Sequence, residues 1–592
     1  MAAFGSLVLA TVAAFFVTQH LKVSTPLIQG RPRPVPATIS PSETGCGGRF
    51  RTTRFSFYLQ HRADDVDVYV VDQSGTIVRT LASGRHMRKD VRTPDGAFPW
   101  NGREDDGKVA PDGTYYFRIA LLHQGRTITL TQTPVLVKTA PPRPLVTAVA
   151  PDLIPDRGLP VAISYRGNQG RPGIVRIYRT DLPGGPRLVR SLAAPAQPAR
   201  ASWDGLIGGR PAPAGTYLAG LDVTDTACNA GHFPAVIPPP AGSTPHAGVT
   251  VRYLAAQPPL DPVPAGSSAR AYVDSRARPY RWTLQRVGAR RPAGHGSGRS
   301  FALRVPIPGG DAGLYELSLA TRSQQTAVPV VARAPASRHP PGILVVLPAL
   351  TWQGENPVDD PPRDGTPNTL SAGGPIQLQR PLADGLPTGF ADEAGLLAYL
   401  AKAHLPYDLT TDLGLLDGTG PTLSGHRGVV LAGSERWLPA ALGASLRSYV
   451  QGGGHVLSLG IDSLRRGVTV QGGRALDPTQ PQATDALGAR SGKLVTGSSD
   501  LVTQTQDGLG IFSHTSGALA GFSSYQPIAS VVPPAQPIAS AAGTSAAPPA
   551  IAGYRLGRGI VVEVGLAGFG SSLAGNVDSQ ELVSRLWAVL SG

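Results

Sequence analysis

The chain has 592 residues, room for roughly three to five domains, and contains 72 glycines and 58 prolines. This composition is typical of turn-rich β-domains and Pro-rich joints and argues against a helical bundle. The formal net charge is +14, but the arginines are scattered among acidic residues and no recognition motif accompanies them, so we exclude nucleic acid as a partner. The charge either keeps the protein soluble or faces an anionic envelope polymer or lipid headgroup.

An uncharged run opens the chain, from Ala2 to Val17, and Leu21 can extend it. The run is just shorter than the ~17–25 residues that span a bilayer, and it lacks both a charged leader and a prompt small-residue cleavage site. We therefore expect residues 1–22 to form an uncleaved signal anchor, a single-pass transmembrane helix in the cell membrane. The bulk of the chain would then be extracytoplasmic. A cleaved signal peptide is the alternative, and residues 23–45 are predicted to be a Pro-rich extended linker.

Two short sequence motifs recur in the first half of the chain. Trp100-Asn101-Gly102 is followed by Gly113-Thr114-Tyr115, and Trp203-Asp204-Gly205 is followed by Gly215-Thr216-Tyr217. Each pair of motifs combines a tight turn with the start of an alternating strand. A repeat at this period indicates two copies of one domain. We predict β-sandwiches at residues 46–140 and 141–237, with the Trp and Tyr rings packed in their cores.

At these residues the sequence resembles the Ig-like repeat of the flagellar hook-capping protein, over roughly residues 48–232. The resemblance implies an Ig-like fold and says little about function. Outside the cytoplasm two lone cysteines are commonly paired, so a Cys46–Cys228 bridge would clamp the two repeats together. Free buried thiols are the alternative. Two cysteines also exclude a zinc or iron–sulfur site built from thiolates alone.

A third, divergent β-sandwich is predicted at residues 246–335, between proline joints at Pro238–Pro245 and Pro340-Pro341. Its Gly313-Leu314-Tyr315 segment resembles the Gly-Thr-Tyr motif, but the Trp-(Asn/Asp)-Gly motif is missing. Whether this domain is a third copy of the repeat therefore stays open.

The pattern changes at residue 340, where continuous apolar strands alternate with amphipathic helices. Strands are predicted at 343–348, 407–410, 428–433, 455–460 and 559–565, and helices at 392–404, 438–451 and 579–590. This alternation is typical of a doubly wound parallel α/β domain, over residues 340–592, in which ligands bind at the carboxyl ends of the strands. The fold class is therefore multidomain β plus α/β. Segments 359–364 and 533–549 are expected to be flexible excursions.

Three segments of this region, Pro348–Asn356, Leu431–Trp437 and Leu446–Leu459, resemble the C-terminal domain of the N,N-dimethylformamidase large subunit, which is akin to the class I glutamine amidotransferase fold. The resemblance implies an iron site held by two tyrosines and a glutamate. Relatives carry Tyr-Asn where this chain has Glu355-Asn356, and a tyrosine where it has Arg436. The iron site is therefore expected to be lost and no cofactor is assigned. An amidotransferase nucleophile is also missing, because Ile461 stands at its expected position and Ser463 follows two residues later.

Four polar residues are the candidate catalytic group, namely Glu355, Glu435, Asp462 and His514. Carboxylates and an imidazole that meet at one sheet edge could hold a hard metal or a hydrolytic water. Alternatively, Glu435 and Asp462 are acids at helix starts and His514 is an ordinary loop residue. Two functions follow. The favoured one is binding or scaffolding of a glycan or protein partner at the cell surface by a catalytically degenerate domain. The other is a hydrolase acting on non-peptide C–N bonds.

Overall fold

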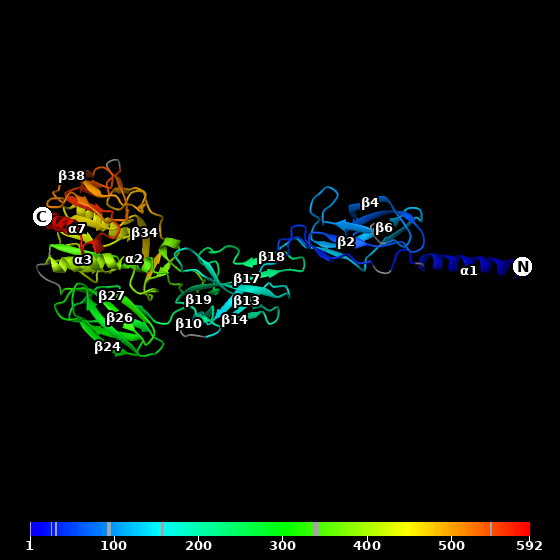
Figure 1. Ribbon diagram of the computed structural model, residues 1–592, viewed down its shortest axis with the longest axis horizontal. Coiled ribbons are helices and arrows are strands. Elements are labelled where there is room, and N and C mark those ends of the chain that lie inside the picture. The colour runs from blue at the N-terminus through cyan, green and yellow to red at the C-terminus, as the bar shows by residue number, and fades with distance from the viewer. Residues whose placement is uncertain are drawn as a thin grey trace.

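The computed structural model describes residues 2–24, 26–29, 32–91, 96–154, 159–335, 342–544 and 547–592. The fold is mostly β-sheet. An N-terminal helix is followed by three β-sandwiches and a C-terminal domain, and the chain runs from the helix at one end to the C-terminal domain at the other (Figure 1).

Helix α1 (Ala2–Ser24) projects away from the first sandwich (Figure 1). Large apolar side chains are exposed along it, including Phe4, Leu9 and Phe16. The predicted helix is therefore present. Among the residues that the structure describes, however, none of the helices is long and apolar enough to cross a bilayer.

Three sandwiches share one strand order. In sandwich 1 the larger sheet has the order β1-β8-β6-β3-β4, in sandwich 2 the order β10-β19-β17-β12-β13, and in sandwich 3 the order β21-β27-β26-β23-β24. The first pair of strands is parallel in each sheet. Sandwich 1 comprises β1 (Thr38–Ile39), β2 (Thr53–Ser56), β3 (Asp64–Val71), β4 (Ile77–Met87), β5 (Ala97–Trp100), β6 (Gly113–Leu121), β7 (Arg126–Thr129) and β8 (Val135–Val137).

The second and third sandwiches repeat this arrangement with longer second sheets, β14-β11-β9 and β20-β22-β25. Sandwich 2 comprises β9 (Leu145–Ala150), β10 (Leu153–Ile154), β11 (Val161–Arg166), β12 (Gly173–Arg179), β13 (Arg187–Ala194), β14 (Arg200–Trp203), β15 (Leu206–Ile207), β16 (Arg210–Pro211), β17 (Gly215–Thr224), β18 (Ala230–Phe233) and β19 (Gly248–Val251). Sandwich 3 comprises β20 (Ala255–Gln257), β21 (Val263–Pro264), β22 (Ser268–Asp274), β23 (Tyr280–Arg286), β24 (Gly294–Gly298), β25 (Ala302–Pro306), β26 (Gly313–Ala320) and β27 (Gln325–Arg333). The matching order makes sandwich 3 a third copy of the same topology.

A tyrosine fixes the same corner in all three copies. The hydroxyl groups of Tyr115, Tyr217 and Tyr315 each donate to the carbonyl oxygen four residues upstream, at 2.8, 2.8 and 2.6 Å. The side chains of Trp100 and Trp203 are buried and contact Tyr115 and Tyr217 edge-on or at a tilt. These rings are core residues, and the tyrosine corner survives in sandwich 3 where the tryptophan is absent.

Two predicted domain borders differ from the structure. The segment 23–45 is not a free linker throughout, because Ile28 and Ile39 are buried in the core of sandwich 1 and β1 pairs with β8. Sandwich 2 extends past residue 237, since β19 pairs with both β17 and β10. Both segments pair over only two to four residues, too few to give an alternating pattern in the sequence.

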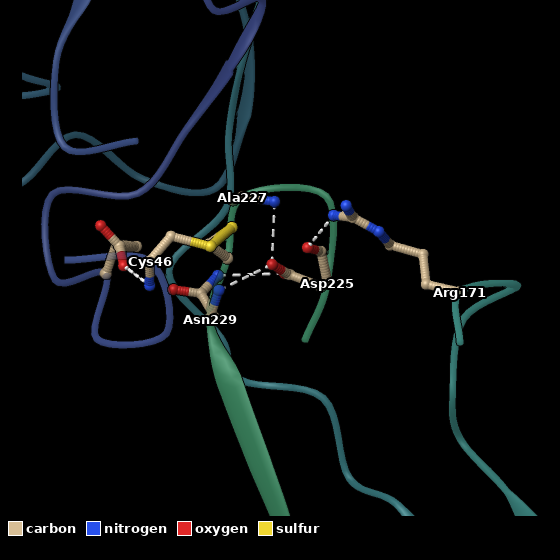
Figure 2. The surroundings of a disulfide bond; sticks show 7 residues. Cys46, Arg171, Asp225, Ala227 and Asn229 are labelled. Carbon is tan, nitrogen blue, oxygen red and sulfur yellow. Dashed lines mark hydrogen bonds between the residues drawn. A yellow bond between two sulfur atoms is a disulfide. The ribbon is translucent and has the colours of Figure 1, made fainter. Parts of the chain in front are cut away.

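A disulfide joins sandwich 1 to sandwich 2 through Cys46 and Cys228, whose Cα atoms lie 5.8 Å apart (Figure 2). Beside it the Gly45 amide donates to the Cys228 carbonyl at 3.0 Å, and the Asn229 amide side chain donates to the Lys138 carbonyl at 3.0 Å. The buried Asp225 carboxylate holds the turn by accepting from the backbone amides of Ala227 and Asn229 (Figure 2). Covalent and hydrogen-bonded contacts therefore clamp the two domains at one point.

The C-terminal domain is built on a nine-stranded sheet of order β30-β28-β31-β33-β44-β43-β42-β38-β39. The first five strands are parallel and the others antiparallel. The strands are β28 (Ile343–Leu347), β30 (Asp408–Thr411), β31 (Gly428–Leu431), β33 (His455–Leu459), β38 (Val502–Asp507), β39 (Ala518–Leu519), β42 (Gln536–Ala542), β43 (Ile551–Leu556) and β44 (Gly559–Val564). The helices are α2 (Ala349–Gly354), α3 (Phe390–Lys402), α4 (Asp412–Asp417), α5 (Ala440–Gln451), α6 (Phe569–Ser572) and α7 (Val577–Ser591).

Shorter strands extend the loops of this domain. They are β29 (Ile376–Gln377), β32 (Trp437–Pro439), β34 (Arg466–Gln471), β35 (Arg474–Leu476), β36 (Ala489–Ser491), β37 (Val495–Thr496), β40 (Ser524–Tyr525) and β41 (Ile528–Val531). Sandwich 3 lies alongside the domain (Figure 1), and its Leu314 and Val331 share a hydrophobic core with Leu396 and Leu400 of α3. Sandwich 3 is therefore packed on the C-terminal domain and adds no length between that domain and sandwich 2.

The segment 359–364 lies between sandwich 2 and the C-terminal domain, with Asp359 and Asp364 buried and Pro361 and Pro362 between them exposed. Asp359 is 1% exposed and accepts hydrogen bonds from the amides of Asp364 and Gly365. The Arg363 carbonyl accepts from the Gly248 amide at 3.1 Å, and the Gly365 carbonyl accepts from the Thr180 hydroxyl at 2.7 Å. The expectation of a flexible excursion is wrong here, because the turn supplies the contacts of an interdomain joint. The same expectation for 533–549 is wrong over β42, which lies within the large sheet.

This joint is expected to weaken as the pH rises. Burial and the neighbouring Asp364 raise the pKa of Asp359 to about 8. The folded protein therefore keeps a proton that the unfolded chain releases near pH 4, and the stability it gives is lost as the pH rises toward 8. Hydrogen exchange of residues 242–248, corrected for intrinsic rates, should show lower protection at pH 9 than at pH 6. Asp359→Asn should flatten this dependence and Asp204→Asn, at an exposed turn, should leave it intact. Equal pH dependence in the Asp359→Asn protein would contradict the assignment.

Candidate functional site

Loops after three parallel strands meet at the carboxyl edge of the sheet. The loop after β31 is tied to helix α2, which follows β28, because the Arg436 amide donates to the Thr351 hydroxyl at 3.0 Å. It is tied to the loop after β33 because the Glu435 amide donates to the Ser463 hydroxyl at 3.2 Å. The candidate residues Glu355, Glu435 and Asp462 therefore lie on neighbouring loops, where a parallel sheet presents its ligand sites.

Glu355 has structural partners at this edge. Its Oε1 atom accepts from the Trp437 indole at 3.1 Å and from the Ser371 hydroxyl at 2.6 Å. The Arg436 guanidinium lies 3.8 Å from the same oxygen. Glu355 thus fixes the ring of Trp437, which is itself buried. The phenol groups of a tyrosine-ligated iron site are absent at these positions, so the residues present do not fit that iron centre.

Glu435 forms a buried acid pair with Asp412. Glu435 is 1% exposed and Asp412 2% exposed. Burial, followed by the charge of Asp412 and a hydrogen bond to it, raises the pKa of Glu435 well above its usual range. Burial also raises the pKa of Asp412, to about 6. The interaction with Glu435 and the hydrogen bonds from backbone amides at the start of α2 act in the opposite direction and lower it. Among the described residues no hydrogen-bond donor reaches either carboxylate oxygen of Glu435, so burial and the facing acids Asp412 and Glu393 favour its neutral form, and neither Glu435 nor Asp412 is open to a substrate.

Asp462 occupies a strained turn directly after β33. Its φ is 56°, a conformation that side-chain-bearing residues seldom adopt. Its carboxylate accepts from Arg466 at 2.6 Å and Arg465 at 3.2 Å, and its amide donates to the Gln526 side chain at 2.6 Å. The positive-φ position of this turn is therefore occupied by Asp462. It lies one residue after Ile461, which stands where a nucleophile was expected from the sequence.

His514 does not join the three acids. It is exposed in the turn after β38, which is separated from β33 by β44, β43 and β42 in the sheet. Strand β38 runs antiparallel to β33, so the turn with His514 lies at the opposite edge of the sheet, and four strand spacings of about 4.8 Å separate the two strands by roughly 19 Å. The prediction of one four-residue cluster is wrong for this residue, because the antiparallel extension of the sheet could not be placed from the sequence. In the part of the chain that the structure describes, no three His, Cys, Asp or Glu side chains are grouped as metal ligands.

A cavity of about 610 Å³ opens beside these loops. Arg436, Asp462, Arg465, Lys493 and Gln526 supply its polar lining. Ile461, Pro481, Ala483 and Leu494 supply apolar surface. Sequence inspection missed Arg465, Lys493 and Gln526, since they come from three separate segments, and it missed Asp412 because its role depends on contact with Glu435.

Residues 47–125 match the family described as FlgD Ig-like domain. The chain is 32% identical over 108 residues to the basal-body rod modification protein FlgD of Salmonella typhimurium, which covers 18% of this chain and 44% of that protein. For the Escherichia coli protein of the same name the identity is 32% over 93 residues, 15% of this chain and 38% of that protein. The chain therefore spans less than half the length of these relatives. The hook-capping resemblance is confirmed for sandwich 1.

Solved structures give weaker likenesses. A β-galactosidase from Rahnella sp. R3 is 14% identical with a TM-score of 0.24, covering 33% of this chain and 26% of that one. The mouse nectin-like molecule 4 ectodomain is 14% identical with a TM-score of 0.19, covering 51% and 98%. Neither supports an argument about fold or function. The resemblance of residues 340–592 to the formamidase domain stays a prediction.

Proposed function

We propose that this protein is an extracytoplasmic envelope protein in which sandwiches 1 and 2 hold a ligand-binding C-terminal domain away from the N-terminal helix. The observation that carries this is the layout of the chain, with the clamped sandwiches between α1 and the C-terminal domain (Figure 1). A disulfide suits an oxidising compartment outside the cytoplasm. The exposed apolar side chains of α1 suit an export or membrane-attachment segment.

For the C-terminal domain we infer a doubly wound α/β fold of the formamidase and amidotransferase type. Taken in chain order, its five parallel strands β28, β30, β31, β33 and β44 are arranged 2-1-3-4-5. Ligands of such sheets bind where the strand order reverses, here between β28 and β31. The acids at that point are engaged, Glu435 in a buried pair and Glu355 with Trp437. This supports binding of a glycan or protein partner by a domain without the catalytic groups of the formamidase.

One observation favours a hydrolase of non-peptide C–N bonds as the second candidate. Asp462 combines a φ of 56° with a place in the wall of the cavity, at the end of a parallel strand. A strained strand-to-loop turn is where α/β hydrolases present their nucleophile. The two arginines that hold its carboxylate argue for a structural role instead.

The test compares binding with hydrolysis in the full chain kept in mild detergent. We expect saturable co-sedimentation with isolated bacterial cell-wall material, and no amine or ammonia release from N,N-dimethylformamide or acetamide above a protein-free blank. Release that is lost in Asp462→Asn and kept in Asp477→Asn, an exposed-loop control, would establish the hydrolase. Absence of both binding and hydrolysis would overturn both candidates.

A further inference from the structure

The cavity beside β33 is lined by five segments of the chain, and hydrogen bonds join several of them. The Gln526 side chain joins two of them, since its Oε1 atom accepts from the Asp462 amide at 2.6 Å and its Nε2 atom donates to the Gly492 carbonyl at 3.3 Å. Arg465 is fixed by a bond from Nε to the Gln482 carbonyl at 2.9 Å. Arg465 and the turn at Asp462 are therefore held in place by the fold before any ligand arrives.

Positive charge in this cavity exceeds negative charge. Arg436, Arg465 and Lys493 line it with one acid, Asp462, and that acid is shared with Arg466. Arg436 lies 3.8 Å from Glu355, too far for a strong charge-assisted hydrogen bond. Within the described ranges, Lys493 has no ion-pair partner and its side chain is exposed. Three cations beside one shared carboxylate repel one another unless an anion balances them.

Backbone conformation at the same turn is also unusual. Asp462 and Leu464 have φ values of 56° and 59°. Such conformations persist where surrounding contacts enforce them, and they gather at ligand sites. Here the enforcing contacts are those of Arg465, Arg466 and Gln526 with Asp462, and the first of them also positions Arg465 in the cavity wall.

We propose that this cavity binds a small organic dianion, with its charged group between Arg436, Arg465 and Lys493 and its apolar part against Ile461, Pro481 and Leu494. The inference goes beyond the proposed scaffold function, because it adds a small-molecule site to the C-terminal domain. A phosphate monoester carries both charges on one group, as this arrangement requires, whereas a dicarboxylate such as succinate carries them at its two ends and serves as the competing probe. Arginine forms paired hydrogen bonds with either group, while lysine adds a point charge.

Titration calorimetry on the full chain tests the site with phenyl phosphate and succinate as probes, and with benzyl alcohol as the neutral control. We expect saturable binding of at least one dianion, weakened by added salt, and none of benzyl alcohol. Tighter binding of phenyl phosphate would assign phosphate monoesters, and tighter binding of succinate would assign dicarboxylates. Failure of both probes at millimolar concentration would overturn the proposal.

Matched variants locate the binding. Lys493→Ala removes an exposed side chain without a structural bond, so the fold should persist, and affinity should fall about tenfold or more, as for one charge-assisted hydrogen bond. Arg436→Gln should have a similar effect. Lys402→Ala, exposed at the end of α3, should bind as the wild type does. Unchanged affinity in Lys493→Ala and Arg436→Gln would place any binding elsewhere and overturn the site. Co-sedimentation with cell-wall material is scored separately, so its retention would leave the scaffold function standing.

Discussion

Replacing both Cys46 and Cys228 with serine is expected to lower the free energy of unfolding of sandwiches 1 and 2 by about 5 kcal/mol. The bridge spans 182 residues, so without it the unfolded chain gains the entropy of a very large open loop. The hydrogen bonds of Gly45 and Asn229 across the joint are too few to replace it. Urea unfolding monitored by hydrogen exchange in β6 and β17 measures the change for these domains separately from the C-terminal domain.

Reductant provides the control for the disulfide. The wild type treated with dithiothreitol should match the double-serine protein, and the double-serine protein should not respond to dithiothreitol. Small-angle scattering should also show a broader range of shapes once the clamp is open. Identical urea midpoints for the oxidised wild type and the double-serine protein would contradict a stabilising bridge.

Glu435→Gln is expected to remove a large pH dependence from the stability of the C-terminal domain. The pKa values of Glu435 and Asp412 are raised in the folded state, so the folded domain retains protons that the unfolded chain releases. The stability they provide is complete below about pH 4 and falls as the pH rises through the folded pKa values, by about 1.4 kcal/mol per pH unit for each such group. A glutamine carries no charge at any pH and removes the charge coupling with Asp412, so this loss should shrink.

Urea unfolding of the C-terminal domain at pH 5 and pH 8 measures the effect. Glu581→Gln, a partly exposed position on α7, is the matched control and should keep the wild-type pH dependence. Glu435→Ala should be destabilised at both pH values by roughly 3 kcal/mol, because it leaves a cavity in the buried core of the domain. A glutamine protein as pH-sensitive as the wild type would show that another group carries the titration.

Local patterns in the sequence determined the elements of this chain. Leu396, Leu397 and Leu400 marked the buried face of α3, and the apolar run at 343–347 marked β28. The repeated Trp-(Asn/Asp)-Gly and Gly-Thr-Tyr motifs predicted two copies of one sandwich, because turn geometry and core packing depend on those residue types. In sandwich 3 the Tyr315 corner was the remaining signal, and only the strand order showed what it meant.

Contacts between distant segments were decided by the tertiary structure alone. The pairing of Glu435 with Asp412, the distance of His514 from β33 and the assembly of Arg436, Arg465 and Lys493 around one cavity depend on strand order and loop paths. The burial of Asp359 depends on how one domain docks on another. Sequence periodicity reports which face of an element is buried, since that is a property of neighbouring residues. Periodicity does not report which elements pack against one another, and the candidate site of this protein is formed by loops from elements that are distant in the sequence.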